Sequence, residues 1–297
     1  MFNIIFVILH YQNIEDTINC ISSIKKLKSL ENNYKIILVD NKSPNETGKK
    51  LKEKYMKDHN IEIILLDKNY GFSKANNIAF RKAKKYNPEA ILILNNDIIF
   101  EDDSFLLNLL KICKSSQKYD IICPDIVNLK EEHQNPMKQE EMNMKKAYKN
   151  MIYELFFYLS MNIYGVRKII AEKRKRREEK WFKNYYEGTK KSKIISDNFI
   201  PFGAFIIYMN QWLKNEEKAF ISDTFMYMEE DMLGIYIKKK KYKMLYSQNL
   251  KVRHLEGRST QNTNENKYKV LRFKSKNKMK ALYKYIKFYK KTKKEKM

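Results

Sequence analysis

Apolar and polar positions follow one repeated pattern along the first hundred residues: a continuous apolar run, a polar turn and then an amphipathic stretch. Short continuous apolar runs are typical of strands in a parallel sheet that helices cover on both faces. The pattern therefore predicts four strands, at Phe2–Leu9, Lys35–Val39, Ile61–Leu66 and Ala90–Leu94.

The stretches between these runs have helical spacing. Apolar residues recur at intervals of three and four, which gives each stretch one apolar face for packing on a sheet. The clearest series are Ile14, Ile18, Ile21, Ile24 and Leu27, and Phe105, Leu106, Leu109, Leu110 and Cys113. Alternating strands and helices predict an α/β fold with a Rossmann-like, doubly wound and mostly parallel sheet. Ligands of such sheets bind beyond the carboxyl ends of the strands.

Polar residues follow three of the predicted strands. They are His10–Asn13, Asp40–Ser43 and Asn95–Asp97. Two interpretations stay open for each group, because Asp, Asn and Ser line ligand crevices but are also ordinary turn and helix-cap residues. Asn69–Ser73 follows the third strand, and there Gly71 is able to adopt positive φ while Ser73 is able to cap the next helix.

Residues 131–197 interrupt the alternating pattern and form a basic, amphipathic, helical insertion. Met151–Val166 is apolar and aromatic, and the basic run Arg167–Lys180 follows it directly. The apolar segment is too short and too interrupted to span a bilayer. It is either a helix that lies in the membrane interface above anionic headgroups, or a core helix followed by a solvated charged helix.

Regular elements are expected again after Asp197. The pattern predicts a strand at Phe199–Tyr208, which contains the small pair Gly203-Ala204. It predicts a last strand at Lys243–Arg253, which ends at His254. Glu229–Tyr236 begins a helix with three consecutive acids. Residues 261–297 form a Lys- and Tyr-rich tail with helical spacing.

Three features carry candidate chemistry. Asp97 directly follows an apolar strand, so it is expected at the crevice, where a hard divalent cation takes oxygen ligands. The acids Glu229-Glu230-Asp231 suit the first turn of a helix and are also placed to act as a general base. His254 is either a metal or phosphate ligand or a structural histidine. Neither a P-loop nor a dinucleotide-binding glycine motif occurs in the sequence.

Composition narrows the class of protein. The chain has 297 residues, and its 43% hydrophobic content with 16 Phe and 21 Tyr excludes a disordered chain. A formal net charge of +25 and a sequence pI near 9.6 favour anionic partners, namely phosphates, nucleic acid or an acidic membrane. The three cysteines match no zinc or disulfide pattern and are predicted to be buried thiols; they are Cys20, Cys113 and Cys123. The apolar start lacks a basic leader, so a first core strand and a cytoplasmic location are predicted.

These motifs, taken together and in order, resemble family-2 glycosyltransferases of the GT-A fold, especially the rhamnosyltransferase-like branch. The segments that carry the resemblance are Val7–Asn13, Val39–Ser43, Asn69–Asn77, Leu94–Asp97, Pro201–Ala204, Tyr227–Asp231 and His254–Ser259. They lie within residues 1–260, which the resemblance makes one GT-A domain with the insertion 131–197.

The resemblance implies an inverting transferase that uses a nucleotide-diphosphate sugar with Mg²⁺ or Mn²⁺. It assigns nucleotide and sugar binding to Leu9, His10, Tyr11, Asp40, Asn69, Gly71, Lys74, Asn96, Gly203 and Ala204. Asn95-Asn96-Asp97 stands at the family's Asp-x-Asp position, with Asp97 as metal ligand beside Asn95, and His254 matches a histidine near the metal or diphosphate.

The acidic triplet is implied to hold the base that deprotonates the acceptor. Its register is open, because the family's Glu-Asp pair appears here as Glu-Glu-Asp. Ungapped counting gives Glu230 and a one-residue gap gives Asp231, with Glu229 as a supporting acid.

The predicted function is sugar transfer from dTDP-rhamnose or a UDP-sugar to a glycan or lipid-linked acceptor during synthesis of a bacterial cell-surface polysaccharide. Peripheral contact with the inner face of an anionic cell membrane is expected, and nucleic acid is not an expected partner. Two alternatives remain at this point: an inactive GT-A scaffold, because Asn95 replaces an acid, and a basic nucleic-acid-binding protein.

Overall fold

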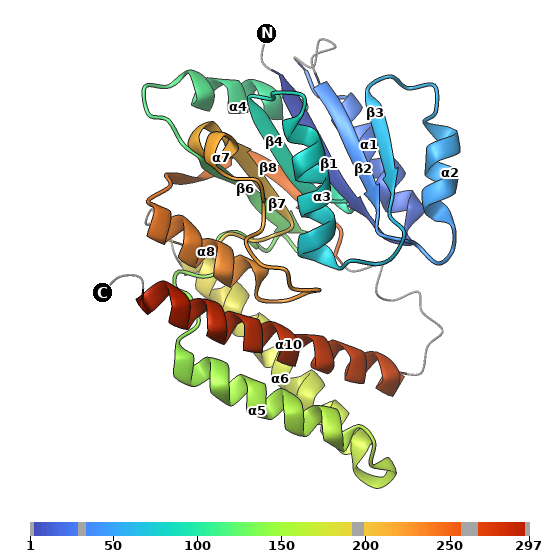
Figure 1. Ribbon diagram of the computed structural model, residues 1–297, viewed down its shortest axis with the longest axis vertical. Helices are drawn as coiled ribbons and strands as arrows, with labels where there is room; N and C mark the ends of the chain where they lie inside the picture. Colours follow the sequence, from blue (N-terminus) through green and yellow to red (C-terminus); the bar gives the residue numbers. More distant parts are fainter. Residues whose placement is uncertain (1–2, 29–33, 192–198, 257–266, 295–297) are drawn as a thin grey trace.

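The computed structural model describes residues 3–28, 34–191, 199–256 and 267–294, and of residues 181–191 only the backbone. Strands and helices alternate along the first half of the chain (Figure 1). The strands are β1 (Ile4–His10), β2 (Tyr34–Asp40), β3 (Ile61–Leu65), β4 (Ala90–Asn95), β5 (Ile98–Ile99), β6 (Ile121–Asn128), β7 (Phe205–Met209) and β8 (Met244–His254). The helices are α1 (Ile14–Lys25), α2 (Thr47–Lys54), α3 (Phe72–Lys84), α4 (Phe105–Lys114), α5 (Met144–Ser160), α6 (Tyr164–Lys191), α7 (Asn210–Asn215), α8 (Glu229–Lys240) and α10 (Lys267–Lys294).

The strands form one mostly parallel sheet in the order β3-β2-β1-β4-β7-β6-β8-β5. The first four strands in this order are parallel, and β6 and β8 are also parallel to each other. β7 is antiparallel to both of its neighbours, and the short β5 is antiparallel to β8. The predicted α/β class with a mostly parallel sheet is therefore confirmed.

Helices cover both faces of the sheet, as the continuous apolar runs predict. Side chains of β1 alternate between two buried clusters, with Phe6 on one face and Val7 on the other. Ile21 of α1 packs on the first face, and Phe80 of α3 packs on the second. Burial of apolar surface in these two layers stabilises the fold, by about 25 cal/mol per Å².

The four N-terminal strands lie where the apolar runs predict them, apart from Phe2, which is outside the described residues. The predicted strand Phe199–Tyr208 is wrong in its first half, because only Phe205–Met209 is a strand. Pro201 lacks an N–H group, and Ile200 pairs instead with Lys138 in an isolated bridge. The pattern also missed β6, a fully buried strand between α4 and the insertion.

Helices α5, α6 and α10 form a layer below the sheet in Figure 1. The buried Glu154 of α5 joins the three helices: Arg174 lies 2.9 Å from its carboxylate, Lys278 lies 3.1 Å away, and Ser275 donates a hydrogen bond of 2.6 Å. A second contact joins α10 and α5 to α8, since Ala147, Met232 and Tyr285 belong to one apolar cluster. The helical tail predicted from its spacing is α10, and it packs against α5 and α8.

The segment Met151–Val166 is not one continuous helix, which corrects the sequence-based expectation. α5 ends at Ser160, and the N–H groups of Asn162 and Ile163 donate to carbonyls only three residues back, at 3.1 Å each. These shorter bonds make a tight turn, after which α6 starts in a new direction. Within the described ranges, no helix combines the length and apolar character that crossing a bilayer requires.

Candidate active site

The candidate site lies where the strand order of the sheet reverses. β1 pairs with β2 on one side and with β4 on the other. A crevice forms beyond the carboxyl ends of strands at such a switch point. Asp40 ends β2, and Asn95 ends β4. The structure thus gathers at one edge the polar residues that follow separate apolar runs.

One half of the crevice is a hydrogen-bonded wall made by the loops after β2 and β3. The buried Asp40 carboxylate accepts a hydrogen bond of 2.5 Å from the Ser43 hydroxyl. Asn41 donates to Asn69 Oδ1 at 3.0 Å, and the same oxygen accepts the Gly71 N–H at 2.9 Å. Because each side chain holds its neighbour, this wall is fixed before any ligand binds.

Gly71 allows two chain segments to meet closely. Its φ is +78°, and a Cβ placed there would lie 2.2 Å from the carbonyl oxygen of Phe225. The Phe72 N–H donates to this same oxygen at 2.7 Å. Three residues on, the exposed Lys74 holds its ammonium 4.6 Å from the centre of the Tyr70 ring. The loop therefore presents a cation beside the wall.

Gly71→Ala is expected to lower the free energy of unfolding by about 2 kcal/mol or more, because the new Cβ would meet a backbone carbonyl at a strained φ. Urea denaturation measures the loss. Gly165→Ala is the matched control, since a Cβ there would meet nothing within 4 Å and alanine favours the helix. Equal stability of Gly71→Ala and the wild type would contradict the close approach of Phe225.

His10 and Asn96 are buried at this edge and brace it. The His10 ring nitrogens lie 2.7 Å from the Thr17 hydroxyl and 2.9 Å from the Thr47 hydroxyl. Burial lowers the pKa of His10 to about 4, so the imidazole is neutral at pH 7. Asn96 donates to the same Thr17 hydroxyl at 2.9 Å. The half-buried Leu9 and Tyr11 flank His10 along the chain.

Asp97 and His254 meet at the other half of the crevice. His254 Nε2 lies 3.2 Å from Asp97 Oδ1. His254 Nδ1 lies 2.7 Å from Gln134 Oε1, and the amide nitrogen of Gln134 donates to Glu256. This network orients the Gln134 amide so that His254 Nδ1 is the proton donor. Nε2 is consequently the ring nitrogen that faces the Asp97 carboxylate. Gly257–Ser259, which follow in the motif, lie outside the described residues.

This pair fits a divalent cation. A nitrogen and a carboxylate oxygen that face each other at 3.2 Å are joined either by a proton on the imidazole or by a cation between them. Neighbouring ligands of a cation that binds at roughly 2.1 Å lie about 3 Å apart, which matches the pair. Among the described residues, no group of three or more His, Cys, Asp and Glu could hold a metal. The half-buried Asn95 is the last residue of β4, two residues before Asp97, and its amide is a further oxygen donor.

The three acids at the start of α8 lie in different environments. Asp231 is buried, contacts Lys138 at 2.6 Å and accepts the Met142 N–H at 3.1 Å. Glu229 is also buried and accepts a hydrogen bond of 3.3 Å from Thr224. Burial, reinforced by Glu230, raises the pKa of Glu229 well above its usual value. Asp231 therefore anchors the preceding segment, while the environment of Glu229 disfavours its charged form.

Glu230 is the half-buried member of the triplet. Burial, followed by the nearby Asp231 carboxylate, raises the pKa of Glu230 to about 7, although the Gly203 N–H donates to its carboxylate. A Cβ on Gly203 would lie 2.8 Å from Glu230 Oε1, so glycine makes room for this side chain. A carboxylate with this pKa is suited to accept a proton near neutral pH.

Residues 202–204 connect the acid to the Asp97–His254 pair. The Asn95 N–H donates to the Ala204 carbonyl at 2.9 Å, which joins the end of β4 to this loop. The ring centres of Phe202 and His254 lie 5.9 Å apart. Gly203, between these two contacts, approaches Glu230. One short loop thus links the candidate base with the candidate metal ligands.

Residues 5–215, more than two thirds of the chain, match the family model described as glycosyl transferase family 2. The chain belongs to glycosyl transferase family 2. No curated protein shows a match to it.

Solved structures share the GT-A fold of this family 2 chain. S. aureus TarS 1-349 has a TM-score of 0.53 and 12% identity, with 85% of this chain and 60% of that chain covered. The mannosyltransferase PcManGT of Pyrobaculum calidifontis, in complex with GDP-Man and Mn²⁺, has a TM-score of 0.54 and 10% identity, with 86% and 57% covered. TarS 1-349 in complex with UDP-GlcNAc covers 89% of this chain and 62% of its own length. The chain therefore spans less than two thirds of the length of each of these neighbours.

Two residues of the site carry no signal in the sequence of this family 2 protein. They are Gln134, which orients His254, and Lys138, which pairs with Asp231. Gln134 and Lys138 lie in the irregular segment between β6 and α5. Polar residues of an irregular segment form no period, so their contacts depend on the path of the chain. The apolar run of β6, which delivers this segment to the site, is the only local hint.

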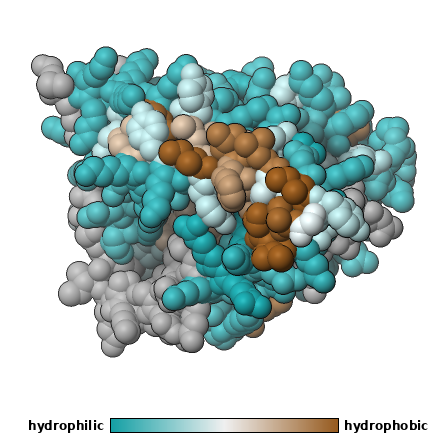
Figure 2. Space-filling model, turned by 90° about the horizontal axis from the view of Figure 1, so that it is seen from below, coloured by the Kyte–Doolittle hydropathy of each residue, from teal (hydrophilic) through white to brown (hydrophobic). Residues whose placement is uncertain are grey.

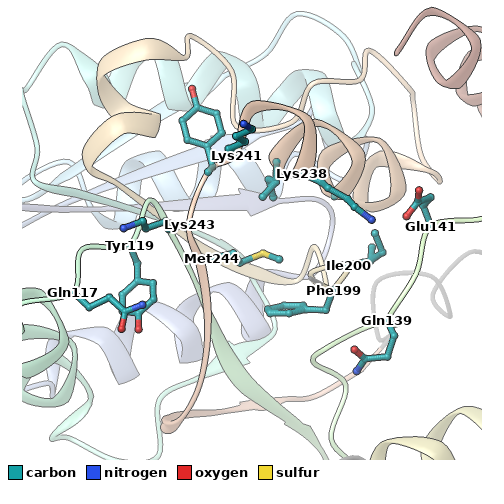
Figure 3. A pocket seen from close by; sticks show the side chains of 13 residues that line it. Gln117, Tyr119, Gln139, Glu141, Phe199, Ile200, Lys238, Lys241, Lys243 and Met244 are labelled. Carbon is teal, nitrogen blue, oxygen red and sulfur yellow. The ribbon is translucent and has the colours of Figure 1, made fainter. Parts of the chain in front are cut away.

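A cavity of about 430 Å³ lies elsewhere in this family 2 protein. Figure 3 shows Lys238 and Lys241 of the α8 end, Met244 at the start of β8, and Phe199 and Ile200 around it. It borders the amino end of β8, whereas the candidate ligands lie at the carboxyl ends. None of the residues assigned to the active site belongs to its lining. Geometry of the polar side chains, rather than cavity size, therefore locates the active site.

Proposed function

We propose that this family 2 protein transfers a sugar from a nucleotide-diphosphate sugar, dTDP-rhamnose or a UDP-sugar, to a hydroxyl group of a glycan or lipid-linked acceptor, with inversion at the anomeric carbon. The proposed setting is synthesis of a bacterial cell-surface polysaccharide. The observation that carries the proposal is the loop of residues 202–204, which joins Glu230 to the Asp97–His254 pair.

The donor binds along the crevice. Asp40, Asn69 and Gly71 form the wall for the nucleotide, and Lys74 contributes positive charge near the phosphates. The two nucleotide sugars bound by the neighbouring structures, UDP-GlcNAc and GDP-Man, support this class of donor. Gly203 and Ala204 line the junction between donor sugar and acceptor.

Asp97, His254 and Asn95 are proposed to hold Mg²⁺ or Mn²⁺. The carboxylate, imidazole and amide groups of these residues are donor types that would bind such an ion. When bound, the ion supplies positive charge that balances the charge on the departing diphosphate. The Mn²⁺ in the PcManGT complex supports this choice of metal.

Glu230 is proposed as the base. The acceptor hydroxyl oxygen forms a bond to the anomeric carbon while the bond from that carbon to the diphosphate oxygen breaks on the opposite face. The acceptor proton passes to the Glu230 carboxylate, and the electron pair of the broken bond leaves with the diphosphate. Glu229 and Asp231 position the first turn of α8 through Thr224 and Lys138.

Calorimetric titration with UDP, TDP, GDP, CDP and their sugars, with Mn²⁺ or with EDTA, tests this proposal. We expect one nucleotide base to bind in Mn²⁺ about tenfold or more tightly than in EDTA, because an ion held by Asp97 and its neighbours would supply positive charge to the diphosphate. Equal affinity in Mn²⁺ and EDTA would contradict the proposed metal. Absence of binding by every member of the panel would contradict the transferase assignment and favour the scaffold alternative.

The acceptor is proposed to be at the inner face of the cell membrane, where the protein associates peripherally. The net charge of +25 favours an anionic surface of this kind.

A further inference from the structure

Helix α5 has two apolar faces. Its inner face is buried, with Ala147 and Phe157 fully covered in the contacts with α10 and α8. The outer face remains exposed and continues into the turn and the start of α6. Its large side chains and their exposed fractions are Ile152 65%, Leu155 48%, Phe156 64%, Leu159 54%, Ile163 56% and Ile169 55%. We name these six residues the outer apolar face.

Figure 2 shows hydrophobic side chains gathered in a band across the underside of the molecule, where α5 lies, with a hydrophilic surround. A contiguous exposed apolar band that is rimmed by polar residues marks an interaction site in a folded protein. Six large side chains on one helix face and the adjoining turn are more than the scattered apolar residues of an ordinary surface.

Nearly all of the net charge of the protein lies in the same three helices. α5, α6 and α10 together contain 27 of the 60 Lys and Arg residues but only five of the 35 acidic residues, a net charge of +22 out of +25. The rest of the chain is therefore close to neutral, at +3. The positive charge belongs to the helical layer and not to the transferase sheet.

The combination of charge and apolar surface identifies the partner. Nucleic acid would pair with the lysines, but its phosphate backbone gains nothing from exposed Ile and Leu side chains. A second copy of this face would bring a net charge of +22 against the same charge, which opposes self-association. An anionic bilayer offers phosphate headgroups for the cations and an acyl boundary for the apolar side chains.

We propose that α5, α6 and α10 form a membrane-docking layer. The outer apolar face enters the boundary between headgroups and acyl chains of an anionic bilayer, and the surrounding Lys and Arg side chains contact lipid phosphates. α5 lies in the plane of the membrane, because its opposite face is already buried in protein.

The docking layer is attached directly to the helix that carries the candidate base. Met228 and Met232, which flank the acidic triplet, pack with Ala147 of α5 and Tyr285 of α10. Lys284 donates to the Asp223 carbonyl at 2.7 Å, in the loop that leads to α8. Docking therefore holds the first turn of α8 at a fixed height above the lipid. This last step rests on the proposed function and assigns the acceptor to the lipid-linked class.

Flotation with vesicles tests the docking layer. The full chain is mixed with phosphatidylcholine vesicles that contain or lack phosphatidylglycerol. We expect binding to the anionic vesicles that weakens as salt increases, because the lysine contacts are screened. Phe156→Ser combined with Leu159→Ser is expected to weaken that binding about tenfold or more, since two apolar side chains that would enter the bilayer are lost.

The matched control is Met56→Ser combined with Leu129→Ser, which removes two residues that are 75% and 60% exposed outside the docking layer. The control is expected to bind as the wild type does. Equal vesicle binding by the Phe156/Leu159 variant and the wild type overturns the proposal, and so does equal binding to both vesicle types. If the wild type binds poly(U) and only the Phe156/Leu159 variant loses this binding, the face belongs to RNA. If the wild type is a dimer and only this variant is a monomer, the face belongs to a second copy.

Nucleotide-sugar titration of the same variants separates the two proposals. Docking concerns a surface distant from the donor site, so the Phe156/Leu159 variant is expected to bind donor with unchanged affinity. Vesicle binding by a chain that binds no nucleotide would contradict the proposed function alone, whereas donor binding without vesicle binding would overturn the docking layer alone.

Discussion

Glu230→Gln is expected to lower kcat by about 10²–10⁴-fold while the Kd for the nucleotide sugar stays unchanged, because the amide retains the shape of the side chain but accepts no proton. The half-buried Glu230 has a pKa raised to about 7 by burial, so the wild-type rate should rise with pH through this value as the carboxylate forms. Product formation measured across pH, with calorimetric donor binding, checks both expectations.

Glu229→Gln is the matched control for this variant. The same substitution one residue earlier is expected to preserve most of the turnover, because burial already disfavours a charge on Glu229 and the amide oxygen of Gln still accepts the hydrogen bond from Thr224. Asp231→Asn removes the charge that pairs with Lys138. It is expected to lower the free energy of unfolding more than it lowers the turnover of each folded molecule. Full activity of Glu230→Gln would show that another group takes the proton.

Asp97→Asn is expected to weaken Mn²⁺-dependent nucleotide binding by about 100-fold, so that the variant binds equally in Mn²⁺ and in EDTA. The physical reason is that the substitution removes the charged oxygen that faces His254 Nε2 at 3.2 Å but keeps the size of the side chain. A loss of this order lies at the upper end of the roughly 10–100-fold effect of changing residues that only support a metal ligand. Calorimetry with and without metal measures it.

Asp103→Asn is the control for the metal site. This acid lies close to Asp97 in the sequence, but it is exposed and pairs with Lys28 at 3.1 Å, so the exchange should leave nucleotide binding unaffected. A response of Asp97→Asn to Mn²⁺ equal to that of the wild type would contradict the ligand assignment. Loss of binding in both Asp97→Asn and Asp103→Asn would indicate a general effect of charge.

Local patterns were sufficient to predict much of the sheet. Ala90–Leu94 is continuous and apolar because β4 is covered on both faces, and the Ile series of α1 recurs at helical spacing because one face packs on the sheet. Polar residues follow these strands directly, so the chain order alone indicated the edge of the crevice. The strand expected at Phe199–Tyr208 failed because Pro201 and the bridge from Ile200 to Lys138 remove the first half from the sheet.

The sequence by itself determined the family, the alternation of strands and helices, and the residue types at the ends of the strands. Only the tertiary structure distinguished the three adjacent acids. Burial raises the pKa values of Glu229 and Glu230, and Asp231 pairs with Lys138, which comes from elsewhere in the chain. The tertiary structure alone also decided which face of α5 is buried. Both faces carry large apolar side chains, and the position of α10 against one of them leaves the other exposed.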